Sequence, residues 1–142
     1  MTTAIADILE GFEFLDDWED RYRYVIELGR ELAPLTEEER NEENRVHGCV
    51  SQVWLAKKIQ SGADNGPILF YKGDSDAHIV RGLVAIVLAQ YSGMSAKGIL
   101  ETNLEEIFGK IGLKEHLTPQ RSNGLSSMVQ RIKDDAAAAL VQ

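Results

Sequence analysis

The sequence predicts an α+β fold, in which one small antiparallel β-sheet of about three strands is packed by helices on one side. Two strand-like runs, Val50–Ile59 and Ile68–Tyr71, flank a cluster of turn-forming residues at 61–67, and this order favours a β-hairpin. Segments with helical periodicity precede and follow the hairpin. The run 79–91 is apolar around most of a helix circumference, which is typical of a central core helix. The length of 142 residues predicts a single domain spanning 1–142.

Two helices are expected before the hairpin. Ile5, Ile8, Leu9 and Phe12 recur at helical spacing, and Gly11 is the expected stop. The second helix is expected to begin at a capping box made by Asp16 and Glu19, and to end by Pro34.

The segment between these helices and the hairpin is strongly charged. Thr36 is expected to cap a short turn at 37–39, because acidic residues favour the start of a helix. In the first strand, the consecutive residues Trp54, Leu55 and Ala56 break the alternation, so helix stays open as an alternative there. Trp54 is expected to anchor the core. A third strand is expected from residues near 45–49.

The second half of the chain is predicted to be helical. Gly73–Asp76 is expected to break the second strand and to cap the apolar helix, which runs to about Tyr91 with Gly93 after it. Thr118 followed by Pro119 predicts the start of the last helix. Further expectations are short helices at 95–101 and 103–108 and a surface position for the alanine tail 136–139.

Composition and charge exclude several functional classes. The net charge is −8, and residues 1–45 carry 14 acidic and 5 basic side chains, a net of −9. Such a surface repels phosphate backbones, so nucleic acid is not an expected partner. No secretory signal is visible, and the apolar run 79–91 is too short for a bilayer, which needs about 20 residues. We expect a cytoplasmic protein without membrane contact, and a single unpaired cysteine fits a reducing compartment.

Cys49 is the only cysteine of the chain and the strongest candidate for chemistry. It cannot form an internal disulfide and offers too few soft ligands for a zinc or iron–sulfur site, so no metal is expected. The structural alternative is a buried packing residue, since free cysteines are often buried. Gly48, Ser51 and Gln52 beside it, and the charged run 37–45 before it, favour the end of a loop. The thiol would then act as a nucleophile or as a carrier.

Four blocks of the sequence form a recognisable set. They are Gly48-Cys49-Val50-Ser51-Gln52-Val53-Trp54, Gly73-Asp74-Ser75-Asp76-Ala77 with 79–83, 116–125, and the weaker match Tyr24-Val25-Ile26-Glu27-Leu28-Gly29. These blocks resemble the SufE/CsdE family, the sulfur acceptors of cysteine desulfurases. They occur in the family's order and cover the chain from about Asp16 to the last helix. The resemblance implies a SufE/IscU-like fold.

The resemblance also implies a function. A cysteine desulfurase of the SufS/CsdA type, which depends on pyridoxal phosphate, would form a persulfide. Cys49 would take its sulfur by transpersulfidation, stimulate the desulfurase, and pass the sulfur to an iron–sulfur scaffold of the SufBCD type. The chain itself would hold no cofactor, would act as an accessory protein rather than an enzyme, and would be a monomer or homodimer. The absence of a second cysteine suits such a carrier, because a neighbouring thiol would resolve the persulfide and expel its sulfur.

Six further residues are candidates for supporting the loop or docking a partner: His47, Gly48, Ser51, Gln52, Asp76 and Arg121. His47 is also a candidate for stabilising the thiolate or moving a proton. Asp76 has an ordinary role as a helix cap, and Arg121 as a charge in the first turns of the last helix, paired with an acid. We expect the resting loop to shield Cys49 partly and to turn outward on docking. The alternatives are a stand-alone thiol hydrolase or peroxidase using Cys49, His47 and Asp76, and an interaction module in which Cys49 only packs.

Overall fold

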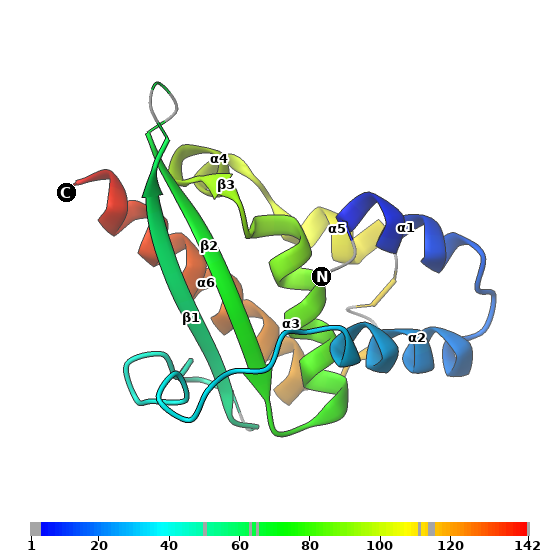
Figure 1. Ribbon diagram of the computed structural model, residues 1–142. Coiled ribbons are helices and arrows are strands. Elements are labelled where there is room, and N and C mark those ends of the chain that lie inside the picture. Colours follow the sequence, from blue (N-terminus) through cyan, green and yellow to red (C-terminus); the bar gives the residue numbers. More distant parts are fainter. Residues whose placement is uncertain are drawn as a thin grey trace.

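A long β-hairpin forms the frame of the molecule. The computed structural model describes residues 4–49, 51–62, 64, 66–110, 112–113 and 116–141. Strands β1 (Val53–Ser61) and β2 (Pro67–Ser75) pair antiparallel, from Val53 opposite Ser75 to Ser61 opposite Pro67. The short β3 (Met94–Ser95) pairs antiparallel with the other edge of β2, so the strand order is β1-β2-β3. The helices lie on one side of this sheet (Figure 1), which confirms the predicted α+β class.

The strand assignments differ from the prediction in two places. The third strand is β3 and does not come from residues near 45–49, where Arg45 makes only an isolated bridge to Trp54. Gly73 does not break β2 but lies inside it, because the helix behind the sheet approaches closely there: a Cβ on Gly73 would stand 2.6 Å from Val84 Cγ1. The predicted first residue of β1, Val50, lies outside the described residues.

The helices before the hairpin begin and end close to their predicted limits. Helix α1 (Ile5–Glu13) continues through Gly11, which is therefore not a stop; the Tyr24 phenol lies where a Cβ of Gly11 would be. Helix α2 (Trp18–Arg30) is capped by Asp17 and not by Asp16, since the Asp17 carboxylate accepts a hydrogen bond from the amide of Asp20 at 3.0 Å.

The predicted cap at Thr36 is confirmed as a reciprocal capping box with Glu39. The Glu39 amide donates to Thr36 Oγ1 at 3.1 Å, and the Thr36 amide donates to the Glu39 carboxylate at 3.0 Å. This Thr36 amide, together with Lys72, keeps the pKa of Glu39 below its ordinary value.

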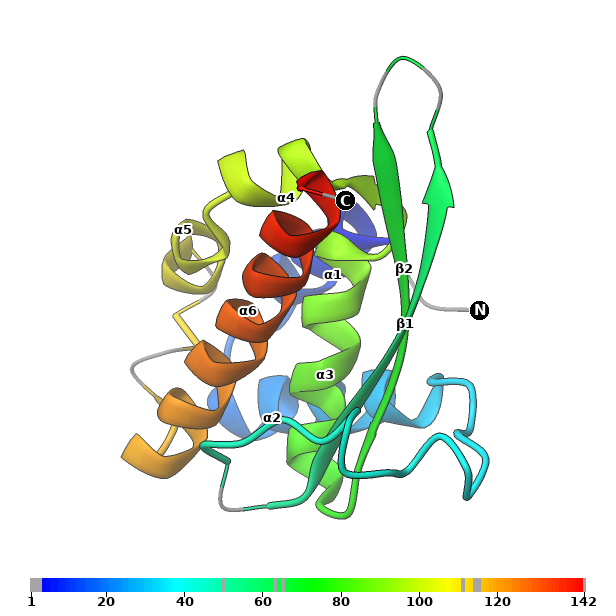
Figure 2. The ribbon, with the colours of Figure 1, turned by 90° about the vertical axis from the view of Figure 1, so that its left-hand side faces the viewer.

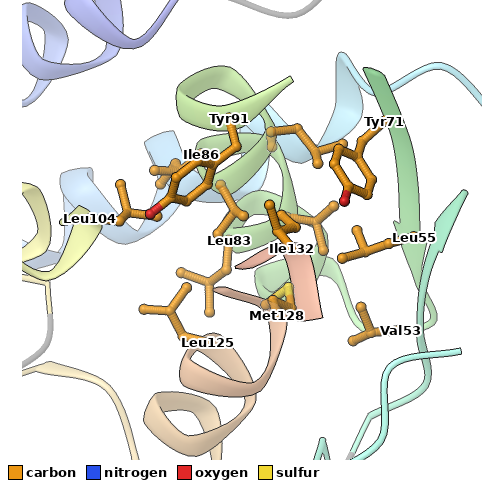
Figure 3. Packing of buried hydrophobic residues seen from close by; sticks show 14 of the residues in the cluster. Val53, Leu55, Tyr71, Leu83, Ile86, Tyr91, Leu104, Leu125, Met128 and Ile132 are labelled. Atoms are coloured by element: carbon orange, nitrogen blue, oxygen red, sulfur yellow. The ribbon is translucent and has the colours of Figure 1, made fainter. Parts of the chain in front are cut away.

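Helix α3 (His78–Tyr91) is the central element, as its composition predicts. It lies between the sheet, α2 and the long α6 (Pro119–Leu140), and Figure 2 shows α3 and α6 side by side on the same side of the hairpin. Side chains from α3, α6 and both long strands meet in one core (Figure 3), where Leu83, Met128 and Val53 are fully buried.

The remaining helices connect α3 to α6. Helices α4 (Ala96–Glu101) and α5 (Leu104–Lys110) follow β3, and Ser95 caps α4 through the amide of Gly98. Thr118 and Pro119 start α6 as predicted. No helix in the described part of the chain has the length and apolar character needed to cross a membrane.

Two side-chain predictions are wrong. Ala136 and Ala139 near the end of α6 are buried, because one face of the helix still packs against the core there. Ala137 and Ala138, on the other face, are exposed as predicted. Trp54 is not a core anchor. It points away from Val53 and Leu55, which face the core, and the guanidinium of Arg40 lies 5.8 Å from its ring centroid.

Candidate functional site: the Cys49 loop

Cys49 lies on a loop that is pinned at its base to β1. We call residues 47–52 the Cys49 loop; Val50 within it lies outside the described residues. Before the loop, the amide of Val46 donates to the carbonyl of Val53 at 2.8 Å, and the carbonyl of Asn44 accepts from the amide of Leu55 at the same distance. The two ends of the loop therefore start from adjacent backbone segments, and the loop projects from the base of the hairpin.

The loop tip is folded down onto α6. Cys49 is half-buried, and its Sγ lies 3.5 Å from the carbonyl oxygen of Gly124, to which the thiol donates. Gly48 has a φ of +93°, in the left-handed region that glycine adopts without strain, and a Cβ there would stand 2.5 Å from Ser127 Oγ. Gly48 thus allows the loop to approach the helix closely.

A small cavity lies beside the sulfur atom. Its volume is about 30 Å³. Its lining comes from the Cys49 loop, from α3 and from α6, and consists of Cys49, Ser51, Val80, Leu83, Gln120, Arg121, Gly124 and Met128. The cavity offers space next to Sγ for at least one further heavy atom, because one water-sized group needs about 10–15 Å³ of such space.

Burial raises the pKa of the Cys49 thiol above its ordinary value. The thiolate is the reactive form of cysteine, and an ordinary thiol is only slightly ionised at neutral pH. In the folded-down position the thiol therefore ionises less readily than an exposed cysteine would.

Asp76 and Gln52 hold the far end of the loop to β2. The amide of Gln52 donates to Asp76 Oδ1 at 3.0 Å, and the amide of Asp76 donates to the carbonyl of Gln52 at 3.3 Å. Asp76 is therefore not the cap of α3. The capping position belongs to Ala77, whose side chain cannot accept a hydrogen bond. The amide of Ala77 itself donates to Ser75 Oγ at 3.3 Å.

His47 points to an acidic neighbour on the surface. Its Nε2 lies 3.1 Å from Glu42 Oε1, and both side chains are more than 70% exposed. Among the described residues, the raised pKa of the Cys49 thiol has burial as its cause, and the His47 imidazole does not contribute to it.

Arg121 lines the cavity and pairs with a phenol instead of the expected acid. Its Nη1 donates to Tyr22 Oη at 2.7 Å, which ties the first turn of α6 to α2. Sequence reasoning did not single out Tyr22, Gly124 or Met128. The last two lie three and seven residues after Arg121, so helical spacing places them on the face of α6 that Arg121 shares.

A buried carboxylate fixes the segment that leads into the loop. Asp74 in β2 is 5% exposed, and its Oδ2 accepts from Arg40 Nη2 at 2.6 Å. Arg81 Nε of α3 lies 2.9 Å from Asp74 Oδ1, although its N–H is not aligned for a hydrogen bond. This network joins the charged segment, the sheet and α3.

Among the described residues, no group of three or more His, Cys, Asp or Glu side chains is placed to hold a metal ion.

Comparison with known proteins identifies the family. The family model described as "SufE: Fe-S metabolism associated domain" matches residues 6–136. The chain belongs to the SufE family. An uncharacterised SufE-like protein of Rhizobium etli is 60% identical over 133 residues, which is 94% of this chain and 89% of that protein. A second SufE-like protein, from Rhizobium meliloti, is 55% identical over 138 residues, 97% of this chain and 98% of that protein.

Membership confirms the resemblance drawn from the four sequence blocks. The SufE family is associated with iron–sulfur metabolism, and membership supports a sulfur-transfer role for this chain. Cys49, the only cysteine, lies within the matched residues of this SufE-family protein.

Proposed function

We propose that Cys49 carries sulfur as a persulfide between a cysteine desulfurase and an iron–sulfur assembly scaffold. One observation carries the proposal: the only thiol of a SufE-family chain lies on a loop, half-buried beside a cavity of about 30 Å³. A thiol placed this way can be sheltered at rest, and the loop can bring it to a partner.

The transfer conserves atoms and electrons. The thiolate of Cys49, having given its proton to water, attacks the terminal sulfur of the donor's persulfide. A new S–S bond forms at Cys49 Sγ while the S–S bond in the donor breaks, and the donor cysteine leaves as a thiolate. The sulfur atom moves without net oxidation or reduction, so the chain needs no cofactor for the step. A thiolate on the recipient removes the sulfur by the same attack.

Opening of the loop links docking to reactivity. In the closed position, burial keeps the pKa of the thiol high and the sulfur protonated. Turning outward returns the sulfur to water and lowers the pKa toward its ordinary value, because the charged form is no longer desolvated. A partner that binds the open loop therefore selects the reactive form of Cys49.

Closing of the loop shelters the loaded sulfur. The cavity beside Sγ can take one more heavy atom, and its walls include the apolar side chains of Val80, Leu83 and Met128. Small thiols that would reduce the persulfide are kept from the terminal sulfur in this position.

The partner would be a pyridoxal-phosphate-dependent cysteine desulfurase, and the recipient a scaffold complex that builds iron–sulfur clusters. By removing the sulfur that the desulfurase has bound, the chain would speed the desulfurase turnover without being an enzyme itself. The acidic surplus of residues 1–45 offers a surface that a basic patch on such a partner would complement.

A stand-alone hydrolase or peroxidase is less well supported. Such an enzyme would need His47 and Asp76 directed at the thiol. Instead, His47 Nε2 contacts Glu42, and the Asp76 carboxylate is bonded to the amide of Gln52. The raised pKa of Cys49 also disfavours a permanently activated nucleophile.

The test is intact-protein mass spectrometry after incubation with a cysteine desulfurase and cysteine. We expect a gain of one sulfur atom that reductant removes and that the Cys49→Ala variant lacks. An unchanged mass, under conditions where the desulfurase turns over, contradicts the proposal. Turnover of an ester or peroxide by the isolated chain would support the alternative.

A further inference from the structure

A second restraint on the Cys49 loop comes from the far half of α6. Arg131 extends from α6 to the chain segment before the loop. Its Nη2 donates to the carbonyl of Glu43 at 2.7 Å, and its Nη1 donates to the carbonyl of Arg45 at 3.1 Å. Because one planar guanidinium reaches two carbonyls two residues apart, it fixes both the position and the direction of this segment.

Asp135, one turn further along α6, orients this guanidinium. Its Oδ1 lies 3.5 Å from Arg131 Nε and 3.2 Å from Lys57 Nζ of β1. Its Oδ2 accepts a hydrogen bond from Tyr71 Oη of β2 at 2.8 Å. Asp135 is 8% exposed, so a change in its pairing would be costly. The carboxylate thereby ties Arg131 to both long strands.

The Arg131 side chain and the loop contacts share one face of α6. Gly124 touches Cys49, Ser127 lies beneath Gly48, and Arg131 holds the segment 43–45. These three positions are spaced by three and four residues, which places them in one row along the helix. Helix α6 therefore carries both the residues that contact Cys49 and the arginine that holds the segment 43–45 before the loop.

We infer that Arg131 is a positioning residue that holds the Cys49 loop closed on α6. It acts on the segment before the loop, while the Asp76–Gln52 pair acts on the segment after it. The two restraints lie on different elements and can be released separately. Loss of the Arg131 restraint raises the population of the open loop without removing any group that touches the sulfur.

The experiment measures the rate at which iodoacetamide alkylates Cys49 in the folded chain, relative to the urea-unfolded chain. Arg131→Met removes the guanidinium and keeps the apolar stem. Arg131→Lys keeps the charge beside Asp135 but cannot bridge two carbonyls. Gln130→Met is the matched control, since that side chain is exposed and its amide contacts only Asp134 among the hydrogen bonds described for it.

We expect alkylation about fivefold faster in Arg131→Lys, where one of the two hydrogen bonds is lost, and at least about fivefold faster in Arg131→Met, where both are lost. The control should show no change. A wild-type rate in a folded Arg131→Met variant overturns the inference. A wild-type rate in Arg131→Lys overturns the role of the two-carbonyl bridge, because charge alone would then suffice. If the Arg131→Met variant does not fold, Arg131→Lys alone still tests the inference, because its positive charge continues to balance the Asp135 carboxylate.

A second readout rests on the proposed function. If loop closure opposes docking, Arg131→Met should reach half-maximal stimulation of a cysteine desulfurase at about fivefold lower concentration, with an unchanged maximal rate. An unchanged half-saturating concentration in a variant that alkylates faster overturns this step. If the wild-type chain gains no sulfur, the proposed function fails, while the alkylation result still decides the role of Arg131.

Discussion

The sulfur of Cys49 lies directly against Gly124. The thiol donates to the Gly124 carbonyl at 3.5 Å, and a Cβ at position 124 would stand 3.4 Å from Sγ. The glycine leaves space beside the sulfur and lowers the helix propensity of the second turn of α6.

Gly124→Ala should stabilise the fold and impair the persulfide. Alanine at a helix interior is favoured over glycine by about 1 kcal/mol, and the new methyl group makes only van der Waals contact with the resting thiol. It would, however, occupy space beside Cys49 that the terminal sulfur needs. Urea unfolding should show the gain in stability, and mass spectrometry should show a shorter lifetime of the loaded form in glutathione. Gly109→Ala in α5, where a Cβ meets nothing within 4 Å, is the control and should leave the lifetime unchanged.

Gly48→Ala should open the loop without unfolding the chain. A side chain at φ +93° costs about 1–2 kcal/mol, and the Cβ would also collide with Ser127 Oγ. We expect faster alkylation of Cys49. Gly66→Ala is the matched control, because it places a side chain at φ +75° with nothing within 4 Å. Equal alkylation rates in wild type and Gly48→Ala would contradict this role of Gly48.

Asp76→Ala should free the far end of the loop. The hydrogen bond from the amide of Gln52 to the carboxylate is exposed, so its loss should cost about 1 kcal/mol of stability. Hydrogen exchange should be faster at the amide of Gln52, and alkylation of Cys49 should be faster. Asp134→Ala, which removes an exposed carboxylate of α6 bonded to Gln130, should change neither rate. Unaltered exchange at Gln52 in the Asp76 variant would show that the carboxylate does not hold the loop.

The rate of Cys49 alkylation should rise with pH around a midpoint that burial shifts upward. Burial raises the pKa of the thiol, and Arg121 is the charged side chain that also lines the cavity. The folded chain therefore binds this proton more tightly than the unfolded chain. The resulting contribution to stability is present below the ordinary thiol pKa of about 8.5 and is lost as pH rises through the raised folded pKa.

Rates measured against pH should show a higher midpoint for the folded chain than for the urea-unfolded chain. In Cys49→Ser, the unfolding free energy should lack the corresponding decline at alkaline pH. A folded midpoint at or below the unfolded one would contradict the assignment of burial as the dominant effect on Cys49.

Local patterns predicted most elements of the fold, though not β3. The apolar circumference of 79–91 predicted α3, the Thr118–Pro119 pair predicted the start of α6, and Thr36 was predicted to cap the turn that follows it. These signals succeed because a cap or an apolar face depends on residues within one or two turns. The predictions at Gly11 and Gly73 were wrong for the complementary reason: each glycine makes room for a side chain of another element.

The sequence by itself determined the family, the single thiol and its place after a glycine, because these depend only on which residues occur and in what order. Only the tertiary structure decided that Asp76 holds Gln52, that His47 turns to Glu42, and that α6 carries the seat of Cys49 and its Arg131 restraint. For the contacts of Asp76, Cys49 and Arg131, the physical reason is distance along the chain. Cys49 and Gly124 are 75 residues apart, and their contact depends on how α6 packs beside the hairpin, which no local pattern encodes.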